Sequence, residues 1–314
     1  MRWLIILHCS GYSDIEPTKL VLYHLSRNIN KKQSLYLILC GPTRKSIIYL
    51  LKITHQNIEI LKEEKAKGHS STFPIIQKFI SILKTQNVKI NALGFSGHSS
   101  SFVLGPWKRY KVAFLSLDEF NTIITSLNKI KLVLFDSCQM GSMANLCQLA
   151  HLSPTVKYVI ASPGLHPYES FLHLKELFLS TTKQKKIKNY ALQLVKKWHL
   201  MSKEDKDRCC LLFDLKKVKK LQHEIKNNWK DLIFDKRSQL DHTDANLYDL
   251  WTAARNLPKL QQKIEKCVCN WTEFTDKKHC NECKRVRGMS VEIKIPKKFQ
   301  DHFHSNKWVN FLNT

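Results

Sequence analysis

A histidine and a cysteine occupy two comparable positions of the sequence, each just after a short apolar run. His98 follows Leu93–Ser96, and Cys138 follows Leu132–Asp136. Ligands of open α/β sheets bind beyond the carboxyl ends of the strands, so the two side chains face one crevice if their strands are neighbours. The separation of 40 residues leaves room for a loop and one crossover helix. A thiol and an imidazole placed in this way form a nucleophile and base pair.

The residues that follow Cys138 predict a helix that begins immediately after the thiol. Met140, Ala144, Leu146 and Leu149 have the spacing of one helical face. A helix N-terminus favours negative charge, so it would lower the thiol pKa and supply amide donors to a developing oxyanion. The alternative is that the cysteine is a small packing residue, which we expect of Cys9, Cys40, Cys147, Cys209 and Cys210.

The elements that must position these residues alternate between strands and helices in the first half of the chain. Strands are predicted at residues 3–8, 35–40, 90–95, 132–135 and 158–161. Helices are predicted at Pro74–Leu83 and Leu117–Leu127, the second with a capping box formed by Ser116 and Glu119. The strands are almost wholly apolar, which is typical of a sheet that is covered on both faces. The fold class is therefore α/β, with a mainly parallel sheet flanked by helices on both faces.

The pattern changes near residue 181, where long, lysine-rich helical segments begin. They include residues 190–198 and 215–229, and we do not expect alternating strands to resume there. One late strand, at 288–296, lies between Gly288 and Pro296 and is expected to return to the main sheet. The predicted domains are a core at 1–180 and a helical C-terminal region at 181–314.

The chain is strongly basic, with 51 Lys and Arg against 26 Asp and Glu and a net charge of +25. Such a charge suits nucleic acid or another anionic surface. However, the lysines are spread along the chain, and the densest runs, 183–188 and 216–220, have no interleaved aromatic residues on which bases would stack. A basic binding protein is therefore kept as an alternative to an enzyme.

No apolar run approaches the roughly 18 residues that a membrane-spanning helix needs, so no membrane insertion is expected. The run Trp3–Leu7 is also too short for the core of a signal peptide and is interpreted as a strand. We therefore expect an intracellular location, in the cell of origin or in a host cell, and reduced thiols for the 10 cysteines. The oligomeric state does not follow from the sequence.

A second cysteine cluster lies at residues 266–284, which we interpret as an insertion ahead of the late strand. Four thiolates at this spacing can surround a tetrahedral zinc ion with a structural role. The alternatives are unligated thiols or oxidation-sensitive pairs. The candidate ligands are Cys267, Cys269, Cys280 and Cys283, with His279 alongside.

The block Asp136–Ser142, which reads Asp-Ser-Cys-Gln-Met-Gly-Ser, resembles the Asp-Ala-Cys-Leu-Met-Gly-Ser block of the clostripain-like cysteine peptidases, a family with the caspase-like fold. Three other segments are similar to family segments. Phe114–Phe120 resembles a Leu-Ser-Leu-x-Glu-Leu segment, Gly288–Ile293 a late Gly-Leu-Ser-Ile strand, and Trp308–Leu312 a closing Trp-x-x-Phe-Leu. The resemblance is sharp only at the cysteine block.

The resemblance implies a cysteine endopeptidase that acts on protein or peptide substrates and needs no cofactor for its chemistry. Cys138 would attack the scissile carbonyl, His98 would handle protons, and the backbone amides of Ser99 and Cys138 would form the oxyanion hole. The family prefers a basic residue on the acyl side of the cut bond, and Asp136 corresponds to its pocket acid. A carboxylate there would pair with Arg or Lys. The alternative for Asp136 is a carboxylate that caps its own loop.

The sequence departs from the family pattern at two places. Ser99 replaces the glycine that usually follows the histidine, and Ala161–Glu169 replaces a segment with Ser-Glu and Gly-Trp-x-Tyr elements. The loss of that acid leaves calcium dependence open, and Glu169 is a candidate to take its place.

Many relatives mature by cutting themselves between the two catalytic residues. The polar and aromatic segment 106–111 lies in this interval and supplies the self-cleavage candidates Lys108, Arg109 and Lys111. A catalytically inactive member that serves as an interaction module is the second alternative to a peptidase.

Overall fold

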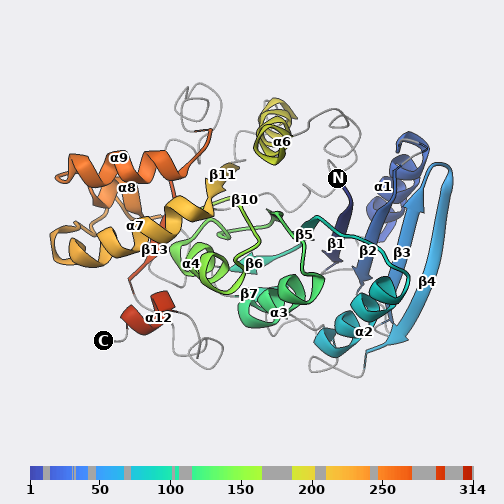
Figure 1. Ribbon diagram of the computed structural model, residues 1–314. Helices are drawn as coiled ribbons and strands as arrows, with labels where there is room; N and C mark the ends of the chain where they lie inside the picture. Colours follow the sequence, from blue (N-terminus) through green and yellow to red (C-terminus); the bar gives the residue numbers. More distant parts are fainter. Residues whose placement is uncertain are drawn as a thin grey trace.

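The computed structural model describes residues 1–9, 15–29, 31, 33–41, 47–66, 72–100, 103–105, 115–164, 186–201, 210–240, 247–270, 288–293 and 307–312. Within these residues, the central feature is an eight-stranded sheet with the order β11-β10-β9-β5-β1-β2-β3-β4 (Figure 1). The chain crosses repeatedly from one part of this sheet to another. Residues far apart in sequence therefore meet at the ends of neighbouring strands.

Five parallel strands form the middle of the sheet, and all five were predicted from the sequence. They are β1 (Trp3–His8), β2 (Leu35–Cys40), β5 (Ala92–Ser96), β9 (Leu132–Asp136) and β10 (Tyr158–Ala161). Nearly all their residues are buried because helices cover both faces of the sheet. This explains their continuous apolar sequences.

Three antiparallel strands extend the sheet at its two ends. At one end, β3 (Ile47–Thr54) and β4 (Asn57–Lys65) form a hairpin beside β2. At the other end, β11 (Leu211–Asp214) pairs with β10. β11 lies in the region after residue 181, where the late strand at 288–296 was the one strand expected to join the main sheet, so the prediction missed β11.

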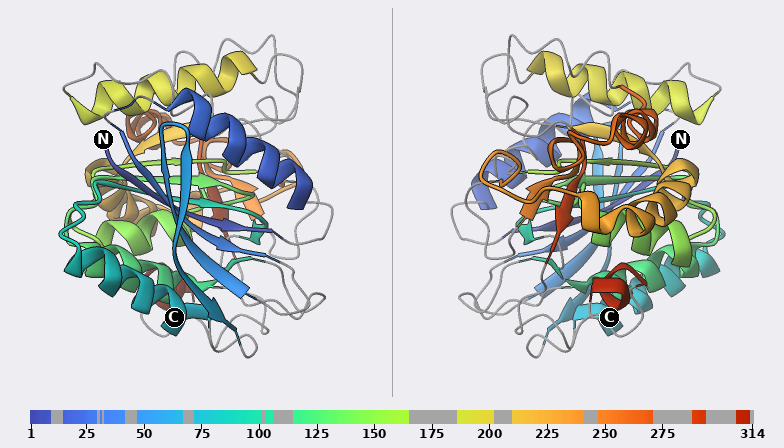
Figure 2. Two further views of the ribbon diagram at one scale, coloured as in Figure 1. Left: turned by 90° about the vertical axis from the view of Figure 1, so that its right-hand side faces the viewer. Right: turned by 90° about the vertical axis from the view of Figure 1, so that its left-hand side faces the viewer.

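Helices pack on both faces of the sheet, as predicted (Figures 1 and 2). One face is covered by α1 (Ile15–Asn28) and α6 (Ile187–Met201). The other is covered by α2 (Thr72–Thr85), α3 (Leu117–Leu127), α4 (Met143–Leu152) and α7 (Leu215–Asn227). The capping box of α3 is confirmed: the Glu119 amide donates to the Ser116 hydroxyl, and the Ser116 amide donates to the Glu119 carboxylate.

The remaining elements lie beside the main sheet. Short strands β6 (Ser99–Ser100), β7 (Val103–Leu104) and β8 (Leu115–Ser116) form a three-stranded sheet between β5 and α3. The C-terminal region adds η4 (Trp229–Asp231), β12 (Leu247–Asp249), α8 (Leu250–Ala253), α9 (Pro258–Cys267), β13 (Ser290–Glu292) and α12 (Lys307–Leu312).

The late strand is shorter than predicted and does not join the main sheet. β13 covers only Ser290–Glu292 of the predicted 288–296, and it pairs with β12 in a separate antiparallel sheet. β13 also has a neighbour outside this small sheet: Ser290 forms a parallel bridge with Ser142, the residue just before α4. The strand therefore packs against the segment that follows Cys138.

Candidate active site

The strands that lead to His98 and Cys138 are direct neighbours in the sheet. β5 and β9 pair in parallel, with Ser96 opposite Asp136. His98 and Cys138 each come two residues after this pair, so both lie beyond the carboxyl ends of adjacent strands. The expected adjacency of the two strands is therefore confirmed.

Hydrogen bonds connect the two segments beyond the strand ends. The Ser99 hydroxyl donates to the carbonyl of Cys138 at 2.5 Å, and the Gly97 amide donates to the carbonyl of Asp136 at 3.2 Å. His98 is exposed and Cys138 is half-buried. The imidazole and the sulfur therefore belong to two linked loops on one rim, and the sulfur is not sealed in the core.

The segment after Cys138 is a turn rather than the start of a helix. α4 begins only at Met143, where the Ser142 hydroxyl accepts a hydrogen bond from the Asn145 amide. Met140 lies in this turn and is fully buried, which explains why the residue is apolar although it is not part of the helix. The prediction that a helix begins directly after the thiol was therefore wrong by several residues.

This turn is held against the segment that follows β10. The Gln139 amide donates to the Gly164 carbonyl, and the Gly141 amide donates to the Ser162 carbonyl, both at 2.7 Å. Gln139 has φ of 59°, a left-handed conformation that is uncommon outside glycine. The turn that carries the thiol therefore adopts a specific backbone path fixed by its neighbour.

Two glycines permit the close packing around these loops. A Cβ atom at Gly97, whose φ is 147°, would lie 2.8 Å from the His8 carbonyl oxygen at the end of β1. A Cβ atom at Gly141 would lie 2.8 Å from the backbone nitrogen of Pro163. Both loops thus approach neighbouring backbone more closely than any larger residue allows.

Glu292 is a residue of this region whose role the sequence did not reveal. Its side chain is fully buried in β13, and Oε2 accepts a hydrogen bond from the amide of Ala144, in the first turn of α4, at 3.3 Å. The Ser290 amide donates to the carbonyl of Gly141 at 3.4 Å. A buried carboxylate at a helix N-terminus is favourable electrostatically. The C-terminal strand thus supports the turn and the helix that follow Cys138.

Asp136 is the last residue of β9, and its side chain is buried with 2% exposed. Its Oδ2 accepts a hydrogen bond from the Ser96 hydroxyl of β5 at 2.6 Å. This contact joins the ends of the two strands, and the capping of its own loop by Asp136 stays a prediction. The role of Asp136 in substrate preference stays a prediction.

Burial distinguishes Cys138 from most other cysteines that the structure describes. Cys9, Cys40, Cys147, Cys210 and Cys267 are buried, whereas Cys138 and Cys269 are half-buried. Burial, with a smaller contribution from Cys9, raises the pKa of Cys40 from 9.0 to about 12, and burial also raises that of Cys147. These buried thiols stay protonated at neutral pH and are packing residues, as expected for Cys9, Cys40, Cys147 and Cys210.

The second cysteine cluster is only partly described. Cys267 ends α9 and donates from its thiol to the Lys263 carbonyl, and burial raises its pKa to about 12. No group of three or more metal-ligating side chains occurs among the residues within the described ranges. Several predicted residues lie outside those ranges: Cys209, Cys280, Cys283, His279, Glu169 and the self-cleavage candidates Lys108, Arg109 and Lys111. Structural zinc therefore stays a prediction.

Among the helices in the described part of the chain, none is long and apolar enough to span a bilayer.

No curated protein matches the chain. The Clostripain family model matches residues 107–292, which include Cys138 but begin after His98.

Solved structures with a similar fold are C11 cysteine proteases. One is a secreted C11 cysteine protease from Bacteroides thetaiotaomicron in complex with an irreversible peptide inhibitor, at 11% identity, 99% coverage of both chains and a TM-score of 0.70. Another is an inactive zymogen C11 protease from Parabacteroides distasonis, at 12% identity, with 99% of this chain and 97% of that chain covered and a TM-score of 0.70. These similarities show a caspase-like fold, and the family match covers more than half of the sequence. The chain therefore belongs to the clostripain family and is a cysteine peptidase.

Proposed function

We propose that the protein is an endopeptidase that uses Cys138 as its nucleophile and His98 as its proton donor and acceptor. The observation that carries this proposal is the pairing of β5 with β9, because it gives both residues the same offset beyond neighbouring strand ends. The hydrogen bond from Ser99 to the Cys138 carbonyl supports it by linking the two loops.

In the proposed reaction, the Cys138 thiolate attacks the carbonyl carbon of the scissile bond and forms a tetrahedral intermediate. The backbone amides of Ser99 and Cys138 stabilise the negative oxygen. When the intermediate collapses, the C–N bond breaks and His98 gives a proton to the leaving amine. Water then attacks the thioester and His98 accepts its proton. The C–S bond breaks, the carboxylic acid product leaves, and the Cys138 thiolate and protonated His98 are restored.

Loss of turnover in single variants tests these two roles. We expect the wild-type protein to cut fluorogenic peptides, and Cys138→Ala and His98→Ala to lose this activity. Cys269→Ser is the control for removal of a half-buried thiol, because Cys269 lies beside β11, where its amide donates to the Leu212 carbonyl. Thermal unfolding of this variant is measured together with its turnover, because Cys269 is also a candidate zinc ligand. Full activity of Cys138→Ala would refute the proposal, and no turnover by any form would favour the inactive interaction module.

We propose further that Asp136 confers preference for Arg or Lys on the acyl side of the cut bond. A carboxylate at the end of the pocket would form charge-assisted hydrogen bonds with a basic side chain. Peptides that end in Arg, Lys, Asn or Asp, tested with and without calcium, measure this preference. Asp136→Asn should selectively reduce turnover of the basic peptides. An equal loss for all four peptides would instead indicate a structural role, through the contact with Ser96.

We also propose self-processing within residues 106–111. Support comes from the three basic residues there, Lys108, Arg109 and Lys111, and from the fold neighbour that is described as an inactive zymogen. Intact-mass measurements of the wild type and of Cys138→Ala test this idea. Wild type should be found as two fragments cut after one of the three residues, and equal masses apart from the substitution would contradict the proposal.

A further inference from the structure

The sheet edge formed by β4 lies far from the rim that carries Cys138. Four strands, β5, β1, β2 and β3, separate β9 from β4. In the part of the chain that the structure describes, β4 is the last strand on this side, and the hairpin that it forms with β3 is seen at the front of the left view in Figure 2. Because it pairs on one side only, half of its backbone amides and carbonyls point away from β3.

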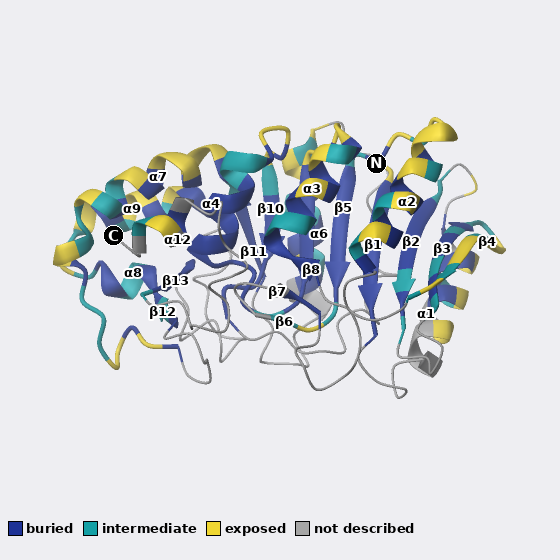
Figure 3. Ribbon diagram, turned by 90° about the horizontal axis from the view of Figure 1, so that it is seen from below, coloured by how far each residue is buried: buried dark blue, intermediate teal, exposed yellow. Residues whose placement is uncertain are grey.

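Much of β4 and of the described part of α1 is exposed (Figure 3), and exposed apolar side chains concentrate beside this edge. Ile58 and Ile60 pair with Ile53 and Leu51 of β3, so all four side chains lie on the face that α1 covers. Five large apolar side chains are strongly exposed among the described residues, and four of them lie on α1 and β4. The exposed fractions are 57% for Leu20, 47% for Tyr23, 38% for Ile58 and 58% for Ile60. Clusters of this kind mark interaction surfaces.

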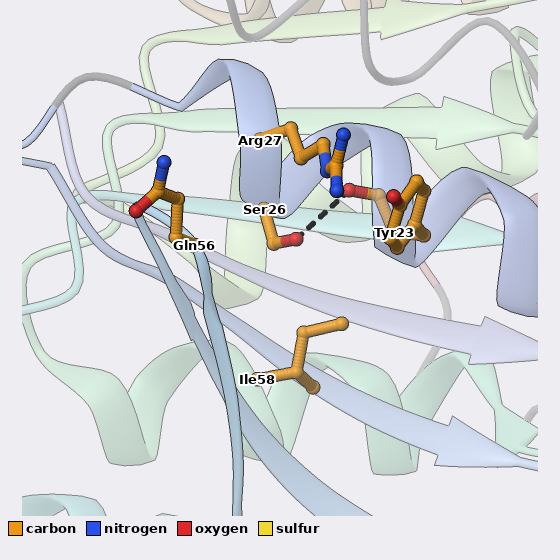
Figure 4. A pocket seen from close by; sticks show the side chains of 5 residues that line it. All are labelled: Tyr23, Ser26, Arg27, Gln56 and Ile58. Atoms are coloured by element: carbon orange, nitrogen blue, oxygen red, sulfur yellow. Dashed lines mark hydrogen bonds between the residues drawn. The ribbon is translucent and has the colours of Figure 1, made fainter.

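A pocket of about 550 Å³ lies within this cluster, between α1 and the start of β4. Figure 4 shows Tyr23, Ser26 and Arg27 projecting from α1, with Gln56 and Ile58 contributed by the hairpin. The Gln56 amide donates to the Ser26 carbonyl at 2.8 Å, which attaches the hairpin turn to the last turns of the helix. The pocket is therefore preformed by a direct connection between its two walls.

The charge of the pocket favours an acidic occupant. Arg27 is exposed and is the one charged residue among the five described residues that line the pocket. Its guanidinium lies 4.5 Å from the centre of the Tyr23 ring, which orients it beside the apolar surface. β4 has three glutamates, of which Glu59 and Glu64 lie on the opposite face and form ion pairs with lysines. Glu63 lies on the α1 face, opposite Tyr49, but is five positions beyond Ile58. The net charge of +25 also opposes close approach of a second copy and attracts an acidic partner.

We propose that β4 and α1 form a docking site for an extended acidic segment of a partner or substrate protein. The segment would add to the sheet as a strand antiparallel or parallel to β4. One bulky apolar side chain would enter the pocket between Tyr23 and Ile58. A carboxylate two positions away, on the same face of the added strand, would pair with Arg27.

A symmetric peptide tests the proposal without knowledge of the natural partner. The probe is fluorescein-labelled Ser-Glu-Thr-Phe-Thr-Glu-Ser, which gives the same spacing in either strand direction and contains no basic residue. We expect it to bind the full-length protein, and its Gln-for-Glu and Ser-for-Phe forms to bind about tenfold more weakly, the factor that corresponds to roughly 1.4 kcal/mol. Hydrogen exchange should slow at the amides of residues 57–61 when the probe is bound.

Three variants separate this site from general charge attraction. Arg27→Glu and Ile58→Ser should each weaken binding of the probe about tenfold, since one removes the ion pair and the other the apolar contact. Lys220→Glu is the matched control: it changes the net charge by the same amount as Arg27→Glu but lies exposed on α7, which packs near β11 at the other end of the sheet. It should leave binding unchanged within about twofold.

Four outcomes of the experiments with the probe would overturn the proposal. They are no binding of the probe, equal losses in Arg27→Glu and Lys220→Glu, unchanged binding in Ile58→Ser, and protection from exchange at residues outside α1 and β4. A dimer in sedimentation that protects residues 57–61 without the probe would overturn it as well, because a second copy would then occupy the edge. Because Cys138 takes no part in the probe's binding, failure here is distinguishable from failure of the peptidase mechanism.

Discussion

Replacement of Gly97 by alanine should separate catalytic geometry from folding. Gly97 lies between Ser96, the last residue of β5, and His98. The added Cβ would lie 2.8 Å from the His8 carbonyl oxygen and 3.1 Å from the His8 Cβ. A comfortable carbon to oxygen contact is about 3.3 Å. The backbone at residue 97 must therefore move by roughly half an ångström, and His98 moves with it.

The size of the effect follows from this displacement. A φ of 147° is also unfavourable for alanine, and such strain costs about 1–3 kcal/mol. A misplacement of about 1 Å reduces catalysis about 100-fold. We therefore expect kcat/KM of Gly97→Ala to fall about 10- to 100-fold, while the sheet, whose core is elsewhere, still folds.

The control for this variant lies in the same strand. A Cβ at Gly94 would meet the Ile5 side chain at 3.4 Å, which is an ordinary contact, so Gly94→Ala should keep kcat/KM within about twofold. The assay is turnover of the fluorogenic peptides, with thermal unfolding measured on both variants. A Gly97→Ala protein that unfolds cooperatively and turns over like the wild type would refute the reasoning. So would an equal loss of activity in Gly94→Ala.

Three further predictions rest on other contacts. Glu292→Ala removes the acceptor of the Ala144 amide, so it should lower the free energy of unfolding by about 1.5–3 kcal/mol and reduce kcat/KM. Glu292→Gln retains an acceptor, so its free energy of unfolding and its kcat/KM should fall less. Urea unfolding and peptide turnover measure both effects, and wild-type stability of Glu292→Ala would contradict the prediction. Cys40 has a pKa of about 12 in the folded protein against an ordinary value of 9.0, so its thiol ionises first in the unfolded chain. The contribution of Cys40 to stability is therefore full below pH 9 and is lost as the pH rises from 9 to about 12. In this pH range, the free energy of unfolding, measured with urea, should decline less in Cys40→Val than in the wild type. Equal declines in the two proteins would contradict the raised pKa of Cys40. Ser116→Ala removes one half of the capping box of α3 and should lower the free energy of unfolding by about 1 kcal/mol, as measured by urea unfolding, with the exposed Thr122→Ala as a control on the same helix.

The centre of the fold could be predicted from the sequence because its strands are buried on both faces. Apolar runs such as Leu132–Asp136 indicate a strand that is buried on both faces, and the capping box at Ser116 indicates the start of α3. The adjacency of β5 and β9 also followed, because one crossover helix fits between His98 and Cys138. These features depend on local sequence and on the usual topology of parallel sheets.

The edges of the sheet were missed because their sequences do not have this character. β4 is mostly exposed and contains five charged residues, so nothing in its composition indicates a strand. β11 has only four residues and comes from a region dominated by helical patterns. β4 is specified by its hairpin with β3, and β11 by pairing with β10, which lies about 50 residues earlier in the chain.

The helix start after Cys138 was wrongly predicted for a related reason, because distant segments determine the path of the turn at this position. Met140 is apolar because it is buried in the turn, and its periodicity with the α4 residues is coincidental. The path of the turn is determined by Ser162 and Gly164 after β10, and by Ser290 and Glu292 of β13, about 150 residues away. If the Cys138 turn is held by these contacts, its geometry depends on the C-terminal region as much as on the strand that leads into it. Under the proposed mechanism, β13 therefore supports the turn that carries the nucleophile, although this strand belongs to the C-terminal region.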